Sequence, residues 1–309
     1  MIDGRPTTAV ETARPTRHAR VTKGARAIWS SQWRWVLLSL SAVVILVLIS
    51  FLVPLFDKSQ PGGIGGGALQ GPSGAHPFGT DEYGRDLFIR VIYGMQVSME
   101  IAVVTIVISG LLGSLAGLYA GYRGGWRDAV IMRIVDFLLG FPPLVLALVL
   151  SAIIGPSSLT PMFATTVISI PLFARMVRGS ALAESQKEYV TASRVSGASN
   201  LRIMMRTLLP SLRGIILVQA AIVGALAIQV EASLSFLGLG VPPPAPSLGG
   251  MVFSSLAFVR NSPLYGLFAG IALVLIIGSF MLLGWTVERA WAGGAGQVQK
   301  PTLLRRREP

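Results

Sequence analysis

Long stretches without a charged residue constrain the fold of this 309-residue chain most strongly. A helix needs about 20 mostly apolar residues to cross the hydrocarbon core of a bilayer. Five runs that are free of charge, apart from Glu231 in the fourth, extend over Trp35–Phe56, Ile101–Tyr122, Phe137–Ala174, Gly214–Phe236 and Leu264–Val287. The third run is too long for one helix, and Gly155-Pro156 supplies a break that divides it in two. The sequence therefore predicts an all-α membrane protein with six transmembrane helices.

The Lys and Arg residues are distributed unevenly between the two sides of such a bundle. If the N-terminus is cytoplasmic, 22 of the 26 Lys and Arg residues fall on the cytoplasmic side, and only Lys58, Arg85, Arg90 and Arg260 fall outside. The positive-inside rule therefore predicts that both termini are cytoplasmic. This distribution also explains the net charge of +12, so nucleic acid is not a predicted partner.

Composition divides the chain into segments whose boundaries follow the apolar runs. The N-terminal segment is rich in Pro, Thr, Ala and Arg and predicts disorder. The predicted segments are a disordered cytoplasmic tail (1–28), a first transmembrane helix (29–56), an external loop with a short amphipathic helix (57–96), a five-helix core with a polar cytoplasmic loop at 178–213 (97–290), and a second cytoplasmic tail (291–309). A glycine run at 62–67 within the external loop predicts a flexible linker.

The external loop holds a polar string, 76–86, followed by apolar residues on one helical face. These apolar residues are Leu87, Phe88, Val91, Ile92 and Met95. One interpretation is a short helix on the outer membrane surface. The other is a contact for an external solute-binding partner, with Asp81, Arg85 and Asp86 as candidate residues.

Small residues and prolines predict how the helices pack. Gly113, Gly117 and Gly121 recur at four-residue spacing in the second apolar run, which allows close approach of a neighbouring helix. Pro142-Pro143 interrupts the next helix, and the carbonyls freed there need protein partners or a water-filled cavity.

Two acidic residues, Asp136 and Glu231, fall within membrane depth and are candidates for the translocation path. Asp136 lies three residues after Arg133, which favours a structural ion pair between them. For Glu231 two interpretations remain open, a hydrogen bond between helices and a side chain that lines the path.

Nothing in the sequence predicts catalysis or a bound cofactor. The only histidines are His18 and His76, so no Ser-His-Asp relay is expected within the bundle. No P-loop follows the glycine run, and the lack of cysteine excludes disulfides and thiolate metal sites. The sequence predicts a non-catalytic conduit, without a metal site, that depends on another protein for energy.

The polar cytoplasmic loop resembles the "EAA" loop of ABC importer permeases. Gly197, Leu209 and Pro210 hold the family's spacing, and Ala192 matches the middle of its triplet. The family's usual Glu, Ala and Ile are replaced by Thr191, Ser193 and Thr207. The strings at 76–86 and 231–246 resemble dipeptide and oligopeptide permeases in particular, and the resemblances together cover about residues 76–290.

This resemblance implies a bundle like those of type I ABC importer permeases, in the bacterial cytoplasmic membrane. It implies a second homologous permease, two ATPase subunits that bind ATP and Mg, and an extracytoplasmic solute-binding protein. The residues implied in coupling to the ATPases are Glu188, Ala192, Gly197, Leu209 and Pro210. Dipeptides, oligopeptides, nickel complexes and other small solutes all remain possible substrates. A self-sufficient channel or secondary carrier is the alternative.

Overall fold

The computed structural model describes residues 17–56, 61–64 and 66–295, and their regular structure is almost entirely helical. The long helices are α1 (Arg17–Phe56), α2 (Leu87–Arg123), α3 (Gly125–Leu139), α4 (Pro143–Ile154), α5 (Leu159–Ser185), α9 (Arg213–Phe236) and α11 (Pro263–Ala295). The short elements are α6 (Glu188–Val195), α7 (Asn200–Arg202), a π-helical turn (Ile203–Leu208), α8 (Leu209–Ser211), α10 (Leu248–Ser255) and a 3-10 turn (Leu256–Phe258). Within these described ranges, β-structure is limited to two isolated bridges. The predicted all-α fold is confirmed.

Five helices are long and apolar enough to cross a membrane: α2, α5, α9, α1 from Trp33 to Leu55, and α11 as far as Trp291. Helices α3 and α4 meet the same criterion together, but they are bent by 88° at the break between them. The break coincides with Pro142-Pro143, because a proline has no N–H with which to continue the helical hydrogen bonds. The six predicted spans are therefore present when this bent pair is counted as one.

Helices α2 and α5 pack against each other along much of their length. The predicted glycine positions are the points where their backbones meet. A Cβ atom added at Gly113, Gly117 or Gly121 would lie 2.5, 2.3 or 2.6 Å from the carbonyl oxygen of Ile170, Ala174 or Arg178, respectively. Only glycine fits at such distances, so the predicted close packing of this helix is confirmed.

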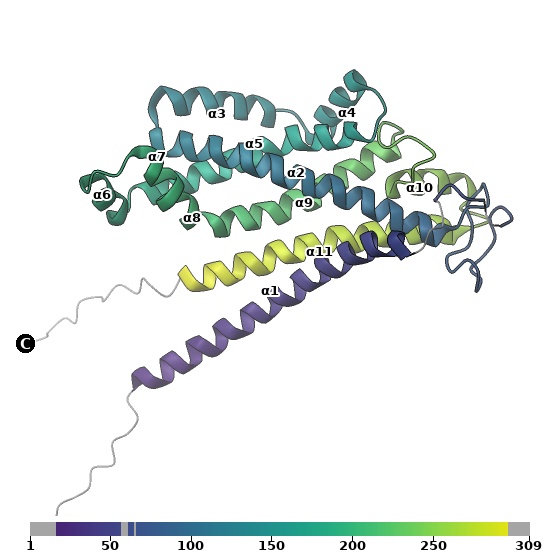
Figure 1. Ribbon diagram of the computed structural model, residues 1–309, viewed down its shortest axis with the longest axis horizontal. Coiled ribbons are helices and arrows are strands. Elements are labelled where there is room, and N and C mark those ends of the chain that lie inside the picture. Colours follow the sequence, from purple (N-terminus) through teal and green to yellow (C-terminus); the bar gives the residue numbers. More distant parts are fainter. Residues whose placement is uncertain (1–16, 57–60, 65, 296–309) are drawn as a thin grey trace, which may run out of the picture.

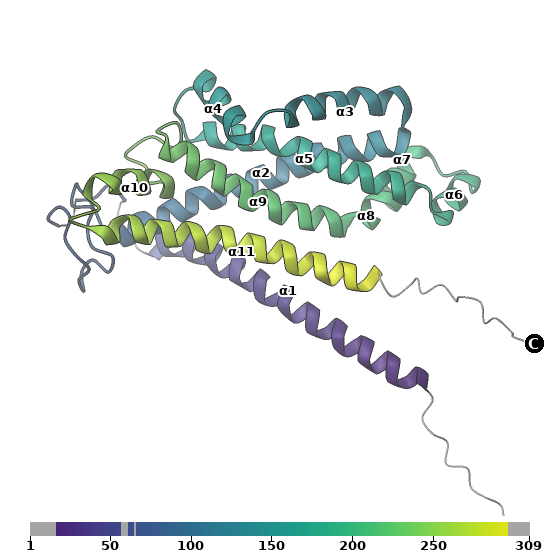
Figure 2. The same cartoon turned by 180° about the vertical axis from the view of Figure 1, so that it is seen from behind.

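The remaining helices surround this pair. Helix α3 lies on one side of the bundle, and α11 and α1 lie on the other, with α9 between them and the α2–α5 pair (Figures 1 and 2). Helix α10 and the segment before α2 lie at one end of the bundle, whereas α6, α7 and α8 lie at the opposite end (Figure 1). The two polar regions recognised in the sequence are thus separated by the length of the bundle.

The amphipathic segment that begins at Leu87 is not a separate surface helix. Leu87, Val91, Ile92 and Met95 share a face as predicted, and all four are buried. They form the first turns of α2, which is 37 residues long. A helix of this length measures ~55 Å, whereas the hydrocarbon core of a bilayer is ~30 Å thick, so part of α2 extends beyond that core. The apolar face therefore packs within the protein, in a core cluster with residues of α10 and α11.

Two predicted boundaries also need correction. Helix α1 begins at Arg17, so residues 17–28 are helical, as their Ala and Arg content permits. Helix α11 continues to Ala295, beyond the predicted end of the core at 290. Residues 1–16 and 296–309 of the two predicted tails lie outside the described residues.

In the predicted glycine linker, the Gly66 N–H donates to the Gly84 carbonyl oxygen at 3.2 Å, so this part is bound to the 76–86 segment.

Candidate functional site

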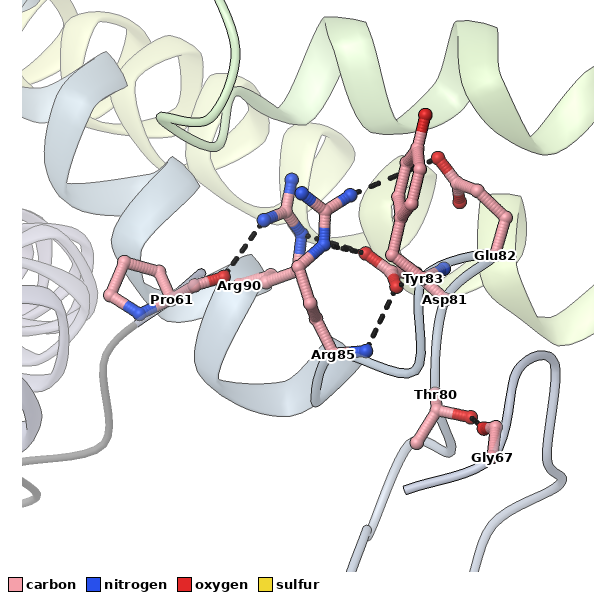
Figure 3. Close-up of polar contacts among 8 residues, drawn as sticks. All are labelled: Pro61, Gly67, Thr80, Asp81, Glu82, Tyr83, Arg85 and Arg90. Atoms are coloured by element: carbon pink, nitrogen blue, oxygen red, sulfur yellow. Dashed lines mark hydrogen bonds and ion pairs between the residues drawn. The ribbon is translucent and has the colours of Figure 1, made fainter. Parts of the chain in front are cut away.

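The carboxylate of Asp81 is the centre of a buried ionic cluster at the α10 end of the bundle (Figure 3). Its Oδ1 accepts hydrogen bonds from the backbone N–H groups of Tyr83 and Arg85, both at 2.9 Å. Its Oδ2 accepts one from Arg85 Nε at 2.6 Å and lies 3.3 Å from Arg90 Nε. The Asp81 side chain is 0% exposed, and those of Arg85 and Arg90 are only 13% and 8% exposed. We call Asp81, Arg85 and Arg90 the Asp81 cluster.

Two glycines fold the chain around this cluster. Gly79 and Gly84 have φ angles of 82° and 76°, in the left-handed region that favours glycine. A Cβ atom at either position would lie 2.3 Å from a backbone carbonyl oxygen of the 66–70 segment. The Thr80 hydroxyl donates to the Gly67 carbonyl oxygen at 2.6 Å (Figure 3). The Gly-Thr-Asp string (79–81) and the Gly-Arg-Asp string (84–86) therefore each form a turn, and the two turns pack together.

The residues expected to contact an external partner have internal contacts instead. Asp81 is inaccessible in this conformation. Asp86 caps α2 by accepting from the Ile89 N–H at 3.1 Å, and it also lies 2.7 Å from His76 Nδ1. The side chain of Tyr83, in contrast, is accessible and is 62% exposed. The Arg85 guanidinium lies 4.4 Å from the centroid of the Tyr83 ring. The sequence pattern carried no signal that singled out Tyr83.

A cavity of about 610 Å³ opens beside the Asp81 cluster. Its lining includes Glu82, Arg85 and Tyr265, together with Ser235 and Pro242. The two strings that most resemble peptide permeases, 76–86 and 231–246, therefore meet at one cavity although they are distant in sequence.

Glu231 lies in the interior of the bundle and joins two helices. Its side chain is 0% exposed. Its Oε2 accepts from the Ser98 hydroxyl of α2 at 2.8 Å, and its Oε1 accepts from the Ser235 hydroxyl one turn along α9 at 2.9 Å. The structure thus contains the interhelical hydrogen bond that was one of the two interpretations. A role in lining the path stays a prediction.

These contacts predict different results for two substitutions of Glu231. Glu231→Gln keeps an oxygen acceptor and the side-chain shape, so the amount of assembled protein should stay close to normal. Glu231→Leu leaves two buried hydroxyls without their acceptor and should destabilise the protein by about 1–3 kcal/mol. Detergent-extracted complex and uptake should be measured for both variants. Normal assembly of the Leu variant would show that the interhelical bond contributes little, and a pH-dependent uptake defect in the Gln variant would favour the path role.

Asp136 has a different partner from the one predicted. It pairs with Arg175 of α5, whereas the expected partner Arg133 is on its own helix. One turn of α5 further along, Arg178 Nε and Nη2 donate to the two carboxylate oxygens of Asp128 at 2.5 and 2.6 Å. The two Asp–Arg ion pairs connect α3 to α5, because each aspartate of α3 pairs with an arginine of α5.

The polar loop predicted to face the cytoplasm is a compact helical unit. Its turn lies at Gly197, which has a φ of 79° and no heavy atom within 4 Å of an added Cβ. The loop is not one continuous helix, because α5 ends at Ser185 and α6 starts at Glu188. Glu184 accepts hydrogen bonds from the Lys187 ammonium at 2.7 Å and the Tyr189 hydroxyl at 2.6 Å across this break. The hydrogen bond to Glu184 raises the pKa of Lys187.

Four of the predicted coupling residues are on or beside the loop's accessible surface. Glu188, Ala192, Gly197 and Pro210 are exposed, and Leu209 is half-buried. Val195, at the end of α6, is 85% exposed, and it was not singled out from the sequence.

Helix α6 is attached to the membrane helices by a small apolar core. Val190 of α6 is fully buried in a cluster that also contains Leu118 and Tyr122 of α2 and Val177 and Ala181 of α5. The Tyr122 hydroxyl donates to Asn200 Oδ1 at 2.9 Å. A displacement of α6 therefore acts directly on the α2–α5 pair.

Comparison with known proteins identifies relatives over most of the chain. Residues 113–290 match the family described as "Binding-protein-dependent transport system inner membrane component". The dipeptide transport system permease protein DppC of Alkalihalophilus pseudofirmus is 35% identical over 249 residues, which cover 80% of this chain and 82% of that protein. DppC of Escherichia coli K12 is 44% identical over 215 residues, covering 70% and 72%. The probable D,D-dipeptide transport system permease protein DdpC of the same strain is 36% identical over 277 residues, covering 88% and 91%.

A solved structure has a similar fold. The MetNI methionine ABC transporter, in inward-facing conformations, contains a chain that aligns with a TM-score of 0.53 at 21% sequence identity. The alignment covers 67% of the present chain and 96% of that one. At this level of identity the similarity concerns the fold alone.

Proposed function

This chain belongs to the family of binding-protein-dependent transport system inner membrane components, and from this membership we propose that it is the permease subunit of an ATP-driven importer of small peptides. The observation that carries the peptide assignment is the 35% identity to a dipeptide permease over 80% of the chain. The membrane-spanning helices make it a multi-pass membrane protein. The family relationship does not support the alternative of a self-sufficient channel or secondary carrier.

The proposed complex contains a second homologous permease, two ATPase subunits and an extracytoplasmic solute-binding protein, in the bacterial cytoplasmic membrane. ATP and Mg bind to the ATPase subunits, and this chain is non-catalytic. Its contributions are half of the translocation path and one docking surface for an ATPase, formed by α6 and the residues around Gly197.

The proposed mechanism is alternating access driven through α6. Closure of the ATPases around ATP displaces α6, and the buried contacts of Val190 pass this displacement to α2 and α5. The close glycine contacts make α2 and α5 move together. The bundle thereby reorients relative to the second permease around a central path.

Uptake of labelled dipeptides tests this function directly. A strain that lacks this chain should lose ATP-dependent uptake and regain it when the chain is supplied. Purified alone, the chain should hydrolyse no ATP. Peptide movement down a gradient through the chain alone would support the channel alternative.

The orientation predicted from the charges can be tested by thiol labelling, because the native chain has no cysteine. A cysteine that replaces Ser73, in the segment before α2, should react with an impermeant reagent added outside intact cells. A cysteine that replaces Ser199, at the loop near Gly197, should react only after permeabilisation. The reverse pattern would contradict the positive-inside assignment.

Two substitutions of Gly197 test the coupling loop. Gly197→Asn serves as the control for Gly197→Val. Asparagine tolerates the left-handed region, so Gly197→Asn should retain most uptake. A β-branched residue is strained there by about 1–3 kcal/mol, so Gly197→Val should shift the turn and uncouple ATP hydrolysis from uptake. Uptake and ATPase activity should be compared at equal amounts of assembled complex. Normal coupling in the Val variant would show that this turn does not position the docking surface.

A further inference from the structure

A cavity of about 580 Å³ lies between α1 and α11, toward the α6 end of the bundle. The Ser39 hydroxyl of α1 lies 2.7 Å from the Thr286 hydroxyl of α11, and both residues are buried at the cavity. From this contact toward the α6 end, the two helices separate (Figures 1 and 2). The other lining residues are Trp35, Leu38, Leu282, Trp285 and Arg289. The volume is within the ~300–1,000 Å³ that is typical of small-molecule sites.

The cavity lies at the depth where the uncharged segments of both helices end. Trp35 is the first residue of the uncharged run of α1, and Val287 is the last residue of the uncharged run of α11. Arg34 and Arg289 lie within two residues of these limits. Tryptophan and arginine at the ends of spans are typical of the boundary between hydrocarbon and headgroups. The cavity is therefore level with the lipid headgroups on the α6 side of the membrane.

The Arg289 guanidinium lies at this cavity without a carboxylate partner. Its Cζ is 3.6 Å from the centroid of the Trp285 ring, so a cation–π contact orients the group. Among the described residues, no carboxylate forms an ion pair with Arg289. The neighbouring Glu288 is exposed and does not line the cavity. The two lining hydroxyls are bonded to each other, so the guanidinium carries the N–H donors that are available to a ligand.

The charge of the adjoining part of α1 favours an anionic occupant. From Arg17 to Arg34 this helix has five Lys and Arg residues and no Asp or Glu. A helix of a second permease could cover the apolar lining, but it would also bury the Arg289 cation, which then needs a counter-charge. An anionic phospholipid satisfies both parts of the site. Its acyl chain matches the leucines and tryptophans, and basic pockets between transmembrane helices bind anionic headgroups.

We propose that this cavity binds one anionic phospholipid from the leaflet on the α6 side, with the phosphate at Arg289 and an acyl chain between α1 and α11. The planar guanidinium can donate two parallel hydrogen bonds to a phosphate. Arg34, one helical turn before Leu38, adds a second cation beside the site. The lipid fills the space where the two helices separate and holds α1 against the bundle. This site goes beyond the proposed function, because it recognises a membrane lipid whichever solute is carried.

Lipid binding to the delipidated complete transporter tests the headgroup contact. Native mass spectrometry should show tighter binding of dioleoyl phosphatidylglycerol, which is anionic, than of dioleoyl phosphatidylethanolamine, which is neutral overall. Arg289→Gln should weaken phosphatidylglycerol binding about fivefold, the usual contribution of one cationic side chain at an anionic lipid surface. The matched control is Arg213→Gln, because Arg213 also lies beside a tryptophan, 5.7 Å from the Trp291 centroid, but outside the cavity. This control should bind phosphatidylglycerol normally. Equal affinities for the two lipids, or unchanged binding by Arg289→Gln, would overturn the proposal.

Photolabelling tests the position of the lipid. Phosphatidylglycerol with a photoreactive acyl chain should label residues 35–39 and 282–289 in the complete transporter. Leu282→Trp places a larger side chain in the cavity and should reduce this labelling, whereas Met281→Trp, on a face outside the cavity, should not. Labelling found only in other segments contradicts the site. A disulfide between Leu38→Cys and a cysteine of the second permease contradicts it as well, because a partner helix then fills the cavity.

Discussion

Replacing Asp81 by asparagine is expected to destabilise the protein by about 3–5 kcal/mol, the usual result of removing one partner from a buried ion pair. Asparagine has nearly the same shape as aspartate. Its amide oxygen can keep the two backbone hydrogen bonds from Tyr83 and Arg85. The group that replaces Oδ2 is an amide NH₂, which then faces the Arg85 Nε donor at the position of a 2.6 Å hydrogen bond. Two largely buried guanidiniums lose their shared counter-charge.

Thermal unfolding of the purified protein in detergent measures this effect. The matched control is Asp86→Asn, five residues along the chain. Asp86 is 20% exposed and caps α2, and asparagine is as good an N-cap as aspartate, so this variant should unfold close to the native temperature. Similar unfolding temperatures for the two variants would show that the Asp81 charge does not hold the two arginines in place.

The sequence was sufficient to predict the features that depend on local chemistry. Spans follow from uncharged runs because a bilayer excludes charge, and the break at Pro142-Pro143 follows from the missing N–H groups. The glycine contacts of α2 were also predictable, because spacing alone places small residues on one face. Their partner, α5, was not, since any neighbouring helix could have filled that role.

The side-chain partners were not predictable, because they come from distant parts of the chain. Asp136 was assigned to Arg133 by proximity in sequence, but its partner is Arg175 on another helix. Likewise, nothing near Glu231 in the sequence identified Ser98 as its hydrogen-bond donor. The burial of Asp81 was missed for a related reason. A string of polar residues suggests an exposed loop, whereas here two glycine turns fold it inward around its own arginines.

Alanine at Gly117 is expected to destabilise the α2–α5 pair by about 1–3 kcal/mol through overpacking, despite the better helix propensity of alanine. The added methyl group would lie 2.3 Å from the Ala174 carbonyl oxygen and 3.0 Å from the Arg178 nitrogen, so the two backbones must separate. Gly110→Ala, on the same helix, is the matched control. Its added Cβ would lie 3.4 Å from Phe173 Cζ, an ordinary contact, and the variant should be neutral or up to about 1 kcal/mol more stable.

The separation of α2 from α5 in the Gly117→Ala variant should reduce uptake by more than it reduces the amount of assembled complex. Leu118, next to Gly117, packs in the cluster that holds Val190 of α6. Moving α2 away from α5 therefore loosens the attachment of the proposed ATPase-docking helix as well as the helix pair itself. Uptake per assembled complex should fall in the Gly117→Ala variant and stay normal in the Gly110→Ala variant. Normal uptake per complex with reduced assembly would show that the spacing of α2 and α5 stabilises the bundle without transmitting the displacement of α6.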